Sequence, residues 1–198
     1  MTLYCATTNA GKLREFRAAG GPEFLIEPMP GLRAIDPPEE SGLTFEENAI
    51  VKALYYASQA PKAPGTFLFA EDSGLEADDL CGEPGVYSAR YAGPEATDEE
   101  NNALLLDRMK NSIDRSARYV CAIALVRDGE LLDTFRGTVE GAILAIPRGT
   151  GGFGYDPLFF YPPFGASFAE VAPEKKAQVS HRSRALAAMF ESLRKLTP

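Results

Sequence analysis

The chain has 198 residues, of which 45% are hydrophobic and 24% charged, and it carries a formal net charge of −8 at pH 7. These values predict one compact domain with a sizeable core and exclude a disordered tail, a fibre or a coiled coil. The negative charge also argues against a protein that binds long DNA or RNA, because that affinity depends on lysine and arginine displacing counterions from phosphates. A small anionic substrate fits, provided that a local basic pocket or a bound metal ion receives it.

Cys5, Cys81 and Cys121 are odd in number and have no CxxC spacing, so they predict neither a disulfide framework nor a zinc site. No signal peptide is visible at the N-terminus, and the longest strongly apolar run, Tyr119 to Val126, is too short to span a bilayer. We therefore expect a soluble protein of the reducing cytoplasm.

The first elements expected along the chain form a strand, loop and helix. Hydrophobic periodicity predicts a buried strand from Leu3 to Thr7, a turn at Asn9 to Gly11 and a helix from Lys12 to Ala19. A second strand is expected near Phe24 to Glu27.

Two later helices are indicated by capping boxes, in which a threonine stands three residues before a glutamate. The sequence from Thr44 to Glu47 predicts a helix that ends near Gln59, and the sequence from Thr97 to Glu100 predicts one that ends near Met109. Between them, Thr66 to Ala70 has the pattern of a buried strand.

In the second half, Asp128-Gly129 separates the apolar runs Ala117 to Val126 and Leu131 to Phe135, which is typical of a β-hairpin. Antiparallel strands beside α/β units indicate a mixed sheet. A strand is expected from Leu158 to Tyr161 and a closing helix from Ser183 to Leu196. One face of that helix gathers the apolar residues Leu186, Met189, Phe190 and Leu193.

The segment Thr7 to Lys12, TTNAGK, joins the first strand to the first helix. Backbone N–H groups, the helix dipole and a lysine can together hold phosphate at such a position. The segment is not a Walker A motif, which would need a glycine in place of Ala6 and a hydroxyl after the lysine. The alternative is a plain helix cap with the lysine in solvent.

Carboxylates gather in two segments, Glu71-Asp72 and the group Asp36, Glu39 and Glu40. Two segments of this kind suit a Mg²⁺ site whose coordination shell is completed by substrate phosphates. Glu71 and Asp72 are expected at a strand end, where open α/β sheets place ligand sites. The alternative is a solvated acidic surface.

The segment Gly149 to Gly154 matches GxGxxG, but a dinucleotide fingerprint must open a helix, and Pro157 with a strand follows here. A turn-rich loop is the simpler interpretation. Phe153 within it is an aromatic side chain that could stack on a base.

A basic group formed by Lys175, Lys176, Ser180, His181 and Arg182 precedes the last helix and contains the one histidine of the sequence. Since no GxSxG elbow is present, a serine hydrolase built on His181 has little support. The alternative interpretation is that these residues are ordinary charged side chains at a helix terminus, exposed to solvent.

Five sequence blocks, taken together and in order, resemble the inosine triphosphate pyrophosphatase family over nearly the whole chain. They are TTNAGK, ESGLTFEENAIVKA, EDSGLEADDLCGEPGVYSARYAG, GTGGFGYDP and KKAQVSHR. The resemblance implies a single α/β domain over residues 1–198, with a long mixed sheet flanked by helices and two lobes around a nucleotide cleft. It also implies a homodimer.

The resemblance further implies that Glu40 and Asp72 bind Mg²⁺, with Asp72 also the proton acceptor. Glu71 stands where many bacterial relatives have a second aspartate, so the number of metal ions stays open. The residues implied in substrate binding are Thr7, Thr8, Asn9, Ala10, Gly11, Lys12, Ser73, Phe153, Gly154, Tyr155, Asp156, Lys176, His181 and Arg182.

The activity so implied is hydrolysis of ITP, dITP and XTP to the monophosphate and pyrophosphate. Two alternatives stay open: a related pyrophosphatase that acts on pyrimidine or modified nucleotides, and a sensor that binds ITP without turnover. A screen of triphosphates separates the first, and Mg²⁺-dependent release of pyrophosphate excludes the second.

Overall fold

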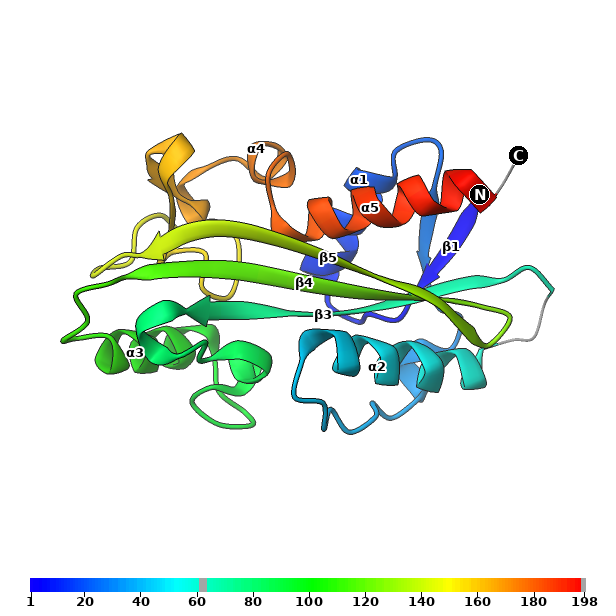
Figure 1. The fold of residues 1–198 in the computed structure, drawn as a ribbon, viewed down its shortest axis with the longest axis horizontal. Coiled ribbons are helices and arrows are strands. Elements are labelled where there is room, and N and C mark those ends of the chain that lie inside the picture. The colour runs from blue at the N-terminus through cyan, green and yellow to red at the C-terminus, as the bar shows by residue number, and fades with distance from the viewer. Residues whose placement is uncertain (61–63, 197–198) are drawn as a thin grey trace. The chain divides into compact units, whose positions relative to one another are not determined.

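A computed structural model describes residues 1–60 and 64–196 and contains a seven-stranded mixed sheet with the order β2-β1-β3-β4-β5-β6-β7 (Figure 1). Strand β1 pairs in parallel with β2 and β3, whereas β6 pairs in antiparallel fashion with β5 and β7. The predicted mixed α/β sheet is confirmed. Its strands are β1 (Thr2–Cys5), β2 (Leu25–Pro28), β3 (Phe67–Ala77), β4 (Ser116–Arg127), β5 (Glu130–Ile143), β6 (Phe159–Tyr161) and β7 (Ala166–Ser167).

The chain divides into two compact units. Unit 1 comprises Met1–Asp72, Cys121–Gly137 and His181–Pro198, and unit 2 comprises Ser73–Val120 and Thr138–Ser180. The helices of unit 1 are α1 (Ala10–Gly20), α2 (Phe45–Gln59) and α5 (His181–Leu196), and those of unit 2 are α3 (Asp98–Arg108) and α4 (Pro173–Ala177). Short 3₁₀ helices lie at Leu32–Ala34, Asp78–Leu80, Gly85–Arg90, Pro162–Phe164 and Phe168–Glu170.

The helix starts follow from local capping chemistry. Both predicted capping boxes are present, so α2 begins after Thr44 and α3 begins after Thr97. The turn predicted at Asn9 to Gly11 is wrong, because α1 already begins at Ala10. The side chain of Asn9 accepts a hydrogen bond from the Lys12 N–H and caps the helix earlier than the apolar pattern indicated.

Strand β3 is longer than its apolar sequence predicted. It continues through Glu71 and Asp72 and ends at Ala77, so the acidic pair lies inside the strand and not at its end. Strand β5 likewise ends at Ile143 instead of Phe135. The turn between β4 and β5 is as predicted, and Asp128 and Gly129 both have the positive φ, 54° and 91°, that a tight hairpin turn requires.

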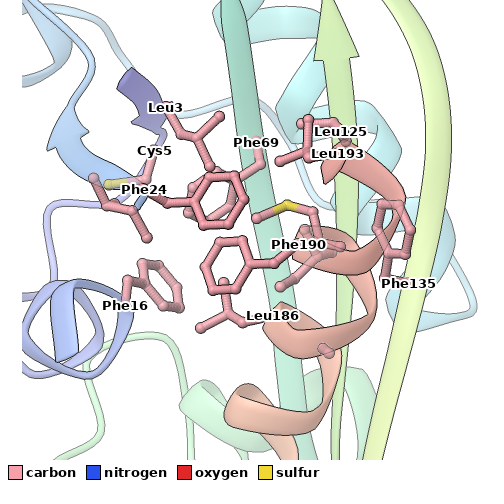
Figure 2. Close-up of a cluster of buried hydrophobic side chains, with 14 of the residues drawn as sticks. Leu3, Cys5, Phe16, Phe24, Phe69, Leu125, Phe135, Leu186, Phe190 and Leu193 are labelled. Carbon is pink, nitrogen blue, oxygen red and sulfur yellow. The ribbon is translucent and has the colours of Figure 1, made fainter. Parts of the chain in front are cut away.

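The core of unit 1 packs α1 and α5 against one face of the strands, while α2 lies on the other face (Figures 1 and 2). Phe24 and Phe190 stack with ring centroids 4.5 Å apart, and Phe16 meets Phe69 edge-on at 5.3 Å. The predicted apolar face of the last helix is confirmed by the burial of Leu186, Met189, Phe190 and Leu193.

The core of unit 2 is aromatic. Tyr119 and Phe159 lie 4.5 Å apart between ring centroids, and Phe159 and Phe168 lie 5.0 Å apart. Tyr155 and Leu158 belong to the same buried cluster, so the loop before β6 is anchored in it. Across the part of the chain that the structure describes, no helix has the length and apolar character needed to cross a membrane.

Candidate active site

Two adjacent carboxylates of β3, Glu71 and Asp72, are the centre of the polar site in unit 1. Both residues are buried, with 5% and 7% of their surface exposed. Because successive side chains of a strand point to opposite faces, the two carboxylates meet different helices. A buried charge is costly unless it is paired, so each face must supply its own cation.

Glu71 points to the face that carries α1 and α5. Lys12 Nζ lies 2.5 Å from Glu71 Oε1, and Arg182 Nε lies 3.8 Å from the same oxygen. The thiol of Cys121 lies 3.4 Å from Glu71 Oε2. Burial alone would raise the pKa of Glu71, but the charges of Lys12 and Arg182 outweigh it and hold this pKa well below its usual range.

Asp72 points to the face that carries α2. Lys52 Nζ lies 2.7 Å from Asp72 Oδ1, and the Asn48 amide donates to Asp72 Oδ2 at 3.3 Å. Burial raises the pKa of Asp72, and the Lys52 ammonium offsets only part of that effect. Burial also acts to lower the pKa of Lys52, but the carboxylates of Asp72 and Glu40 outweigh it and raise this pKa.

Glu40 and Asp72 approach one cation from two segments, since Lys52 Nζ also lies 3.3 Å from Glu40 Oε1. In residues 1–60 and 64–196, no group of three or more His, Cys, Asp or Glu side chains is arranged to hold a metal ion. Two carboxylates suit Mg²⁺, which keeps several waters and takes further oxygens from substrate phosphates. Glu71 faces the opposite side of the strand and is paired with Lys12, which argues against its serving as a third ligand.

The segment Thr7 to Lys12 forms the entry to α1. Thr7 Oγ1 accepts the Asn9 N–H at 3.2 Å, and Asn9 caps the helix. A pocket of about 410 Å³ beside this segment is lined by Thr7, Thr8 and Ala10, together with Arg33. The alternative of a lysine in solvent is wrong, because the side chain of Lys12 is 23% exposed and ion-paired.

Unit 2 gathers a second polar group around Asp156, which is 1% exposed. Its carboxylate accepts the Phe153 N–H at 3.0 Å and the Tyr119 hydroxyl at 3.3 Å. Lys176 Nζ lies 2.6 Å from Asp156 Oδ2 and 4.7 Å from the ring centroid of Phe153. A Cβ atom at Gly152 would collide with the Asp156 carboxylate, so glycine is needed where the loop wraps around it.

Each unit brings together its own share of the predicted residues. Unit 1 contains Thr7 to Lys12, Glu40, Asp72, His181 and Arg182, and unit 2 contains Ser73, Phe153 to Asp156 and Lys176. His181 is 2% exposed and Arg182 is 5% exposed, so the interpretation of this pair as solvated helix-terminal charge is wrong.

Sequence reasoning missed Lys52 and Asn48. They stand four residues apart and therefore on one face of α2, next to the buried Ala49 and Ala53. A lysine and an asparagine at this spacing beside an apolar face were a signal that could have pointed to a buried partner.

Comparisons with known proteins show which proteins this chain resembles over nearly its whole length. The model of the Ham1 family matches residues 3–192. A dITP/XTP pyrophosphatase of Acidobacterium capsulatum is 48% identical over 98% of both chains. The solved structure of a Staphylococcus aureus Ham1 protein has a TM-score of 0.85 at 39% identity and full coverage of both chains. A HAM1 protein from Coxiella burnetii has a TM-score of 0.84 at 37% identity, over 98% of this chain and 99% of that one.

Proposed function

Since this chain belongs to the Ham1 family, we propose that it is a nucleoside triphosphate pyrophosphatase that hydrolyses the non-standard purine nucleotides ITP, dITP and XTP. The products are the nucleoside monophosphate and pyrophosphate. Removing these nucleotides from the pool prevents their incorporation into DNA and RNA.

One observation supports the proposal most directly: each of the two β3 carboxylates, Glu71 and Asp72, forms an ion pair with a lysine, and the two lysines lie on opposite faces of the strand. Lys12 lies at the start of α1 beside the Thr7 to Lys12 segment, and Lys52 lies beside Asp72 and Glu40. Cations next to a helix N-terminus suit a polyphosphate chain. Phosphoryl-type transfer depends mainly on positioning and charge neutralisation, which this set of groups supplies.

Asp72 acts as the base. It accepts a proton from the water whose oxygen attacks the α-phosphorus, while the bond from that phosphorus to the bridging oxygen breaks and pyrophosphate leaves with the electron pair. The raised pKa of Asp72 makes its carboxylate a better proton acceptor than an ordinary aspartate. The segment Thr7 to Lys12 holds the phosphates.

Glu40 and Asp72 hold Mg²⁺ in this proposal. When bound, the ion neutralises phosphate charge and lowers the pKa of a coordinated water. Glu40 Oε1 and Asp72 Oδ1 come from two segments and both face the Lys52 ammonium, and carboxylate oxygens are the ligands that Mg²⁺ takes.

In this proposal the base is bound by the residues that the resemblance to the family implies for its pocket. Phe153 stacks on the purine, with Gly154, Tyr155, Asp156 and Lys176 shaping its surroundings, and Ser73 also contacts substrate. His181 and Arg182 donate to the 6-oxo group of hypoxanthine or xanthine, which adenine replaces with an amino group. The proposal further includes a single domain over residues 1–198, a homodimer and a cytoplasmic location.

Incubation of the purified protein with a panel of purine and pyrimidine triphosphates, with and without Mg²⁺, tests this function. We expect pyrophosphate from ITP, dITP and XTP and little product from ATP, whose 6-amino group does not match the donors His181 and Arg182. Guanine carries the same 6-oxo group, so we expect rejection of GTP to depend on its 2-amino group. Orthophosphate as the product would contradict the bond assignment. Preference for a pyrimidine would favour the related pyrophosphatase, and binding without turnover would favour a sensor. Light scattering of the same preparation tests the homodimer.

A further inference from the structure

We propose that Asp98 and Asn102 of α3 are positioning residues that clamp the loop 152–156 by its central residue, Gly154, and thereby set the affinity for the base. The inference rests on the proposed function for its second half, because it assumes that this loop binds the purine. The clamp itself is a property of unit 2 and can be tested without a substrate.

The clamp holds both polar groups of one residue. The Gly154 N–H donates to Asp98 Oδ2 at 2.6 Å, and the Asn102 side-chain amide donates to the Gly154 carbonyl oxygen at 3.0 Å. Asp98 and Asn102 are four residues apart in α3, so their side chains lie one above the other on the same face of the helix. A single helix face therefore fixes the orientation of the Gly154 backbone.

Gly154 is the point of the loop that most needs such a restraint. Its φ is +62°, in the region that glycine adopts readily, and glycine also has more alternative conformations than any other residue. On one side, the Phe153 N–H is bound by Asp156, and on the other side the Tyr155 hydroxyl donates to the Ser88 carbonyl oxygen at 2.8 Å. The two α3 side chains hold the backbone between these anchors, and with it the direction in which Phe153 points.

Only one half of the Asn102 side-chain amide is hydrogen-bonded, and that half contacts the loop. Among the described residues, Asn102 Oδ1 is one of the few buried side-chain atoms that have no hydrogen-bond partner. A buried unpaired oxygen costs free energy, which offsets part of what the hydrogen bond to Gly154 contributes to folding. What an apolar side chain cannot provide is the donor to Gly154.

Asn102→Leu distinguishes a role of Asn102 in positioning the loop from a role in the stability of the fold. We expect the melting temperature to change little, because removal of the unpaired oxygen offsets the loss of the hydrogen bond to the Gly154 carbonyl oxygen. We expect the KM for ITP to rise by about tenfold, the factor that corresponds to one lost hydrogen bond. The kcat at saturating ITP should change little, since Asp72 and the phosphate-binding residues lie in unit 1. Asn102→Asp, which turns the donor into an acceptor facing the Gly154 carbonyl, should raise KM further.

Hydrogen exchange of the Gly154 amide in the substrate-free protein tests the clamp directly. Asp98→Ala should speed this exchange, whereas Asp98→Asn, which keeps an acceptor oxygen, should restore much of the protection. Glu99→Ala is the matched control, because Glu99 is exposed on the same helical turn and should leave exchange and KM at wild-type values.

Unchanged exchange in Asp98→Ala overturns the clamp. A lower melting temperature in Asn102→Leu with an unchanged KM overturns its role in base binding and assigns Asn102 to the fold. If the wild-type protein fails to hydrolyse ITP, the proposed function fails, while the exchange experiment still decides the clamp.

Discussion

Glu71→Gln offers a quantitative test of the charge pairing inside β3. The substitution keeps the size of the side chain and removes one negative charge from a residue that is 5% exposed. Lys12 Nζ, 2.5 Å away, and Arg182 Nε, 3.8 Å away, then lose their shared anion. Both cations lie in or near the buried interior of unit 1, so the loss is only partly relieved by water.

The expected loss of stability follows from these contacts. Breaking a buried ion pair by removing one partner costs about 3–5 kcal/mol. The lower end applies here, because the side chain of Lys12 is 23% exposed and Arg182 keeps Glu15 at 3.1 Å. A loss of about 3 kcal/mol in a chain of this length lowers the melting temperature by about 6–12 °C.

The pH dependence has a definite sign. The folded-state pKa of Glu71 is lowered, so its contribution to stability is complete above the unfolded pKa, about 4.3, and is lost as the pH falls through the folded value. The difference in melting temperature between wild type and Glu71→Gln should therefore be constant from pH 7 to about pH 5. It should narrow only in stronger acid.

Thermal unfolding followed by circular dichroism measures the loss. The control is Glu191→Gln, because Glu191 forms an exposed pair with Lys195 and its replacement should leave the melting temperature unchanged. Tripolyphosphate should stabilise Glu71→Gln more than wild type, because it supplies an anion for Lys12. A melting temperature within about 2 °C of wild type would refute the pairing argument.

Further predictions concern the proposed chemistry. Asp72→Asn should keep the fold and reduce kcat by about 10²–10⁴-fold, as measured by pyrophosphate release, because an amide is a poor base; activity near wild type would remove Asp72 from that role. Lys12→Ala should raise the KM for ITP and also lower the melting temperature, since Glu71 loses its nearest cation; a change in KM alone would show that Arg182 suffices for Glu71. Arg182→Ala should lower kcat/KM for ITP much more than for ATP, whereas Phe153→Ala should weaken the binding of all purines alike. If Arg182→Ala leaves the ratio of kcat/KM for ITP to that for ATP unchanged, the account of base selection is wrong. Treatment with EDTA should abolish turnover and Mg²⁺ should restore it, and turnover that survives chelation would exclude the metal role of Glu40 and Asp72.

The sequence by itself determined the features that depend on neighbouring residues. The capping boxes at Thr44 and Thr97 fixed the starts of α2 and α3, and Asp128-Gly129 fixed the hairpin turn. The apolar face of α5 was visible from its helical spacing. Such features follow from the chemistry of a few consecutive residues, so a local pattern is enough to predict them.

The tertiary structure alone decided how charge is placed within β3. Glu71 and Asp72 resemble the polar end of a strand in the sequence, yet the strand continues through them to Ala77. It can do so because Lys12 and Arg182 on one face, and Lys52 on the other, arrive from helices far away in the chain. A carboxylate can be buried inside a strand only when a cation pairs with it there. No local sequence pattern predicts which distant lysine or arginine forms that pair.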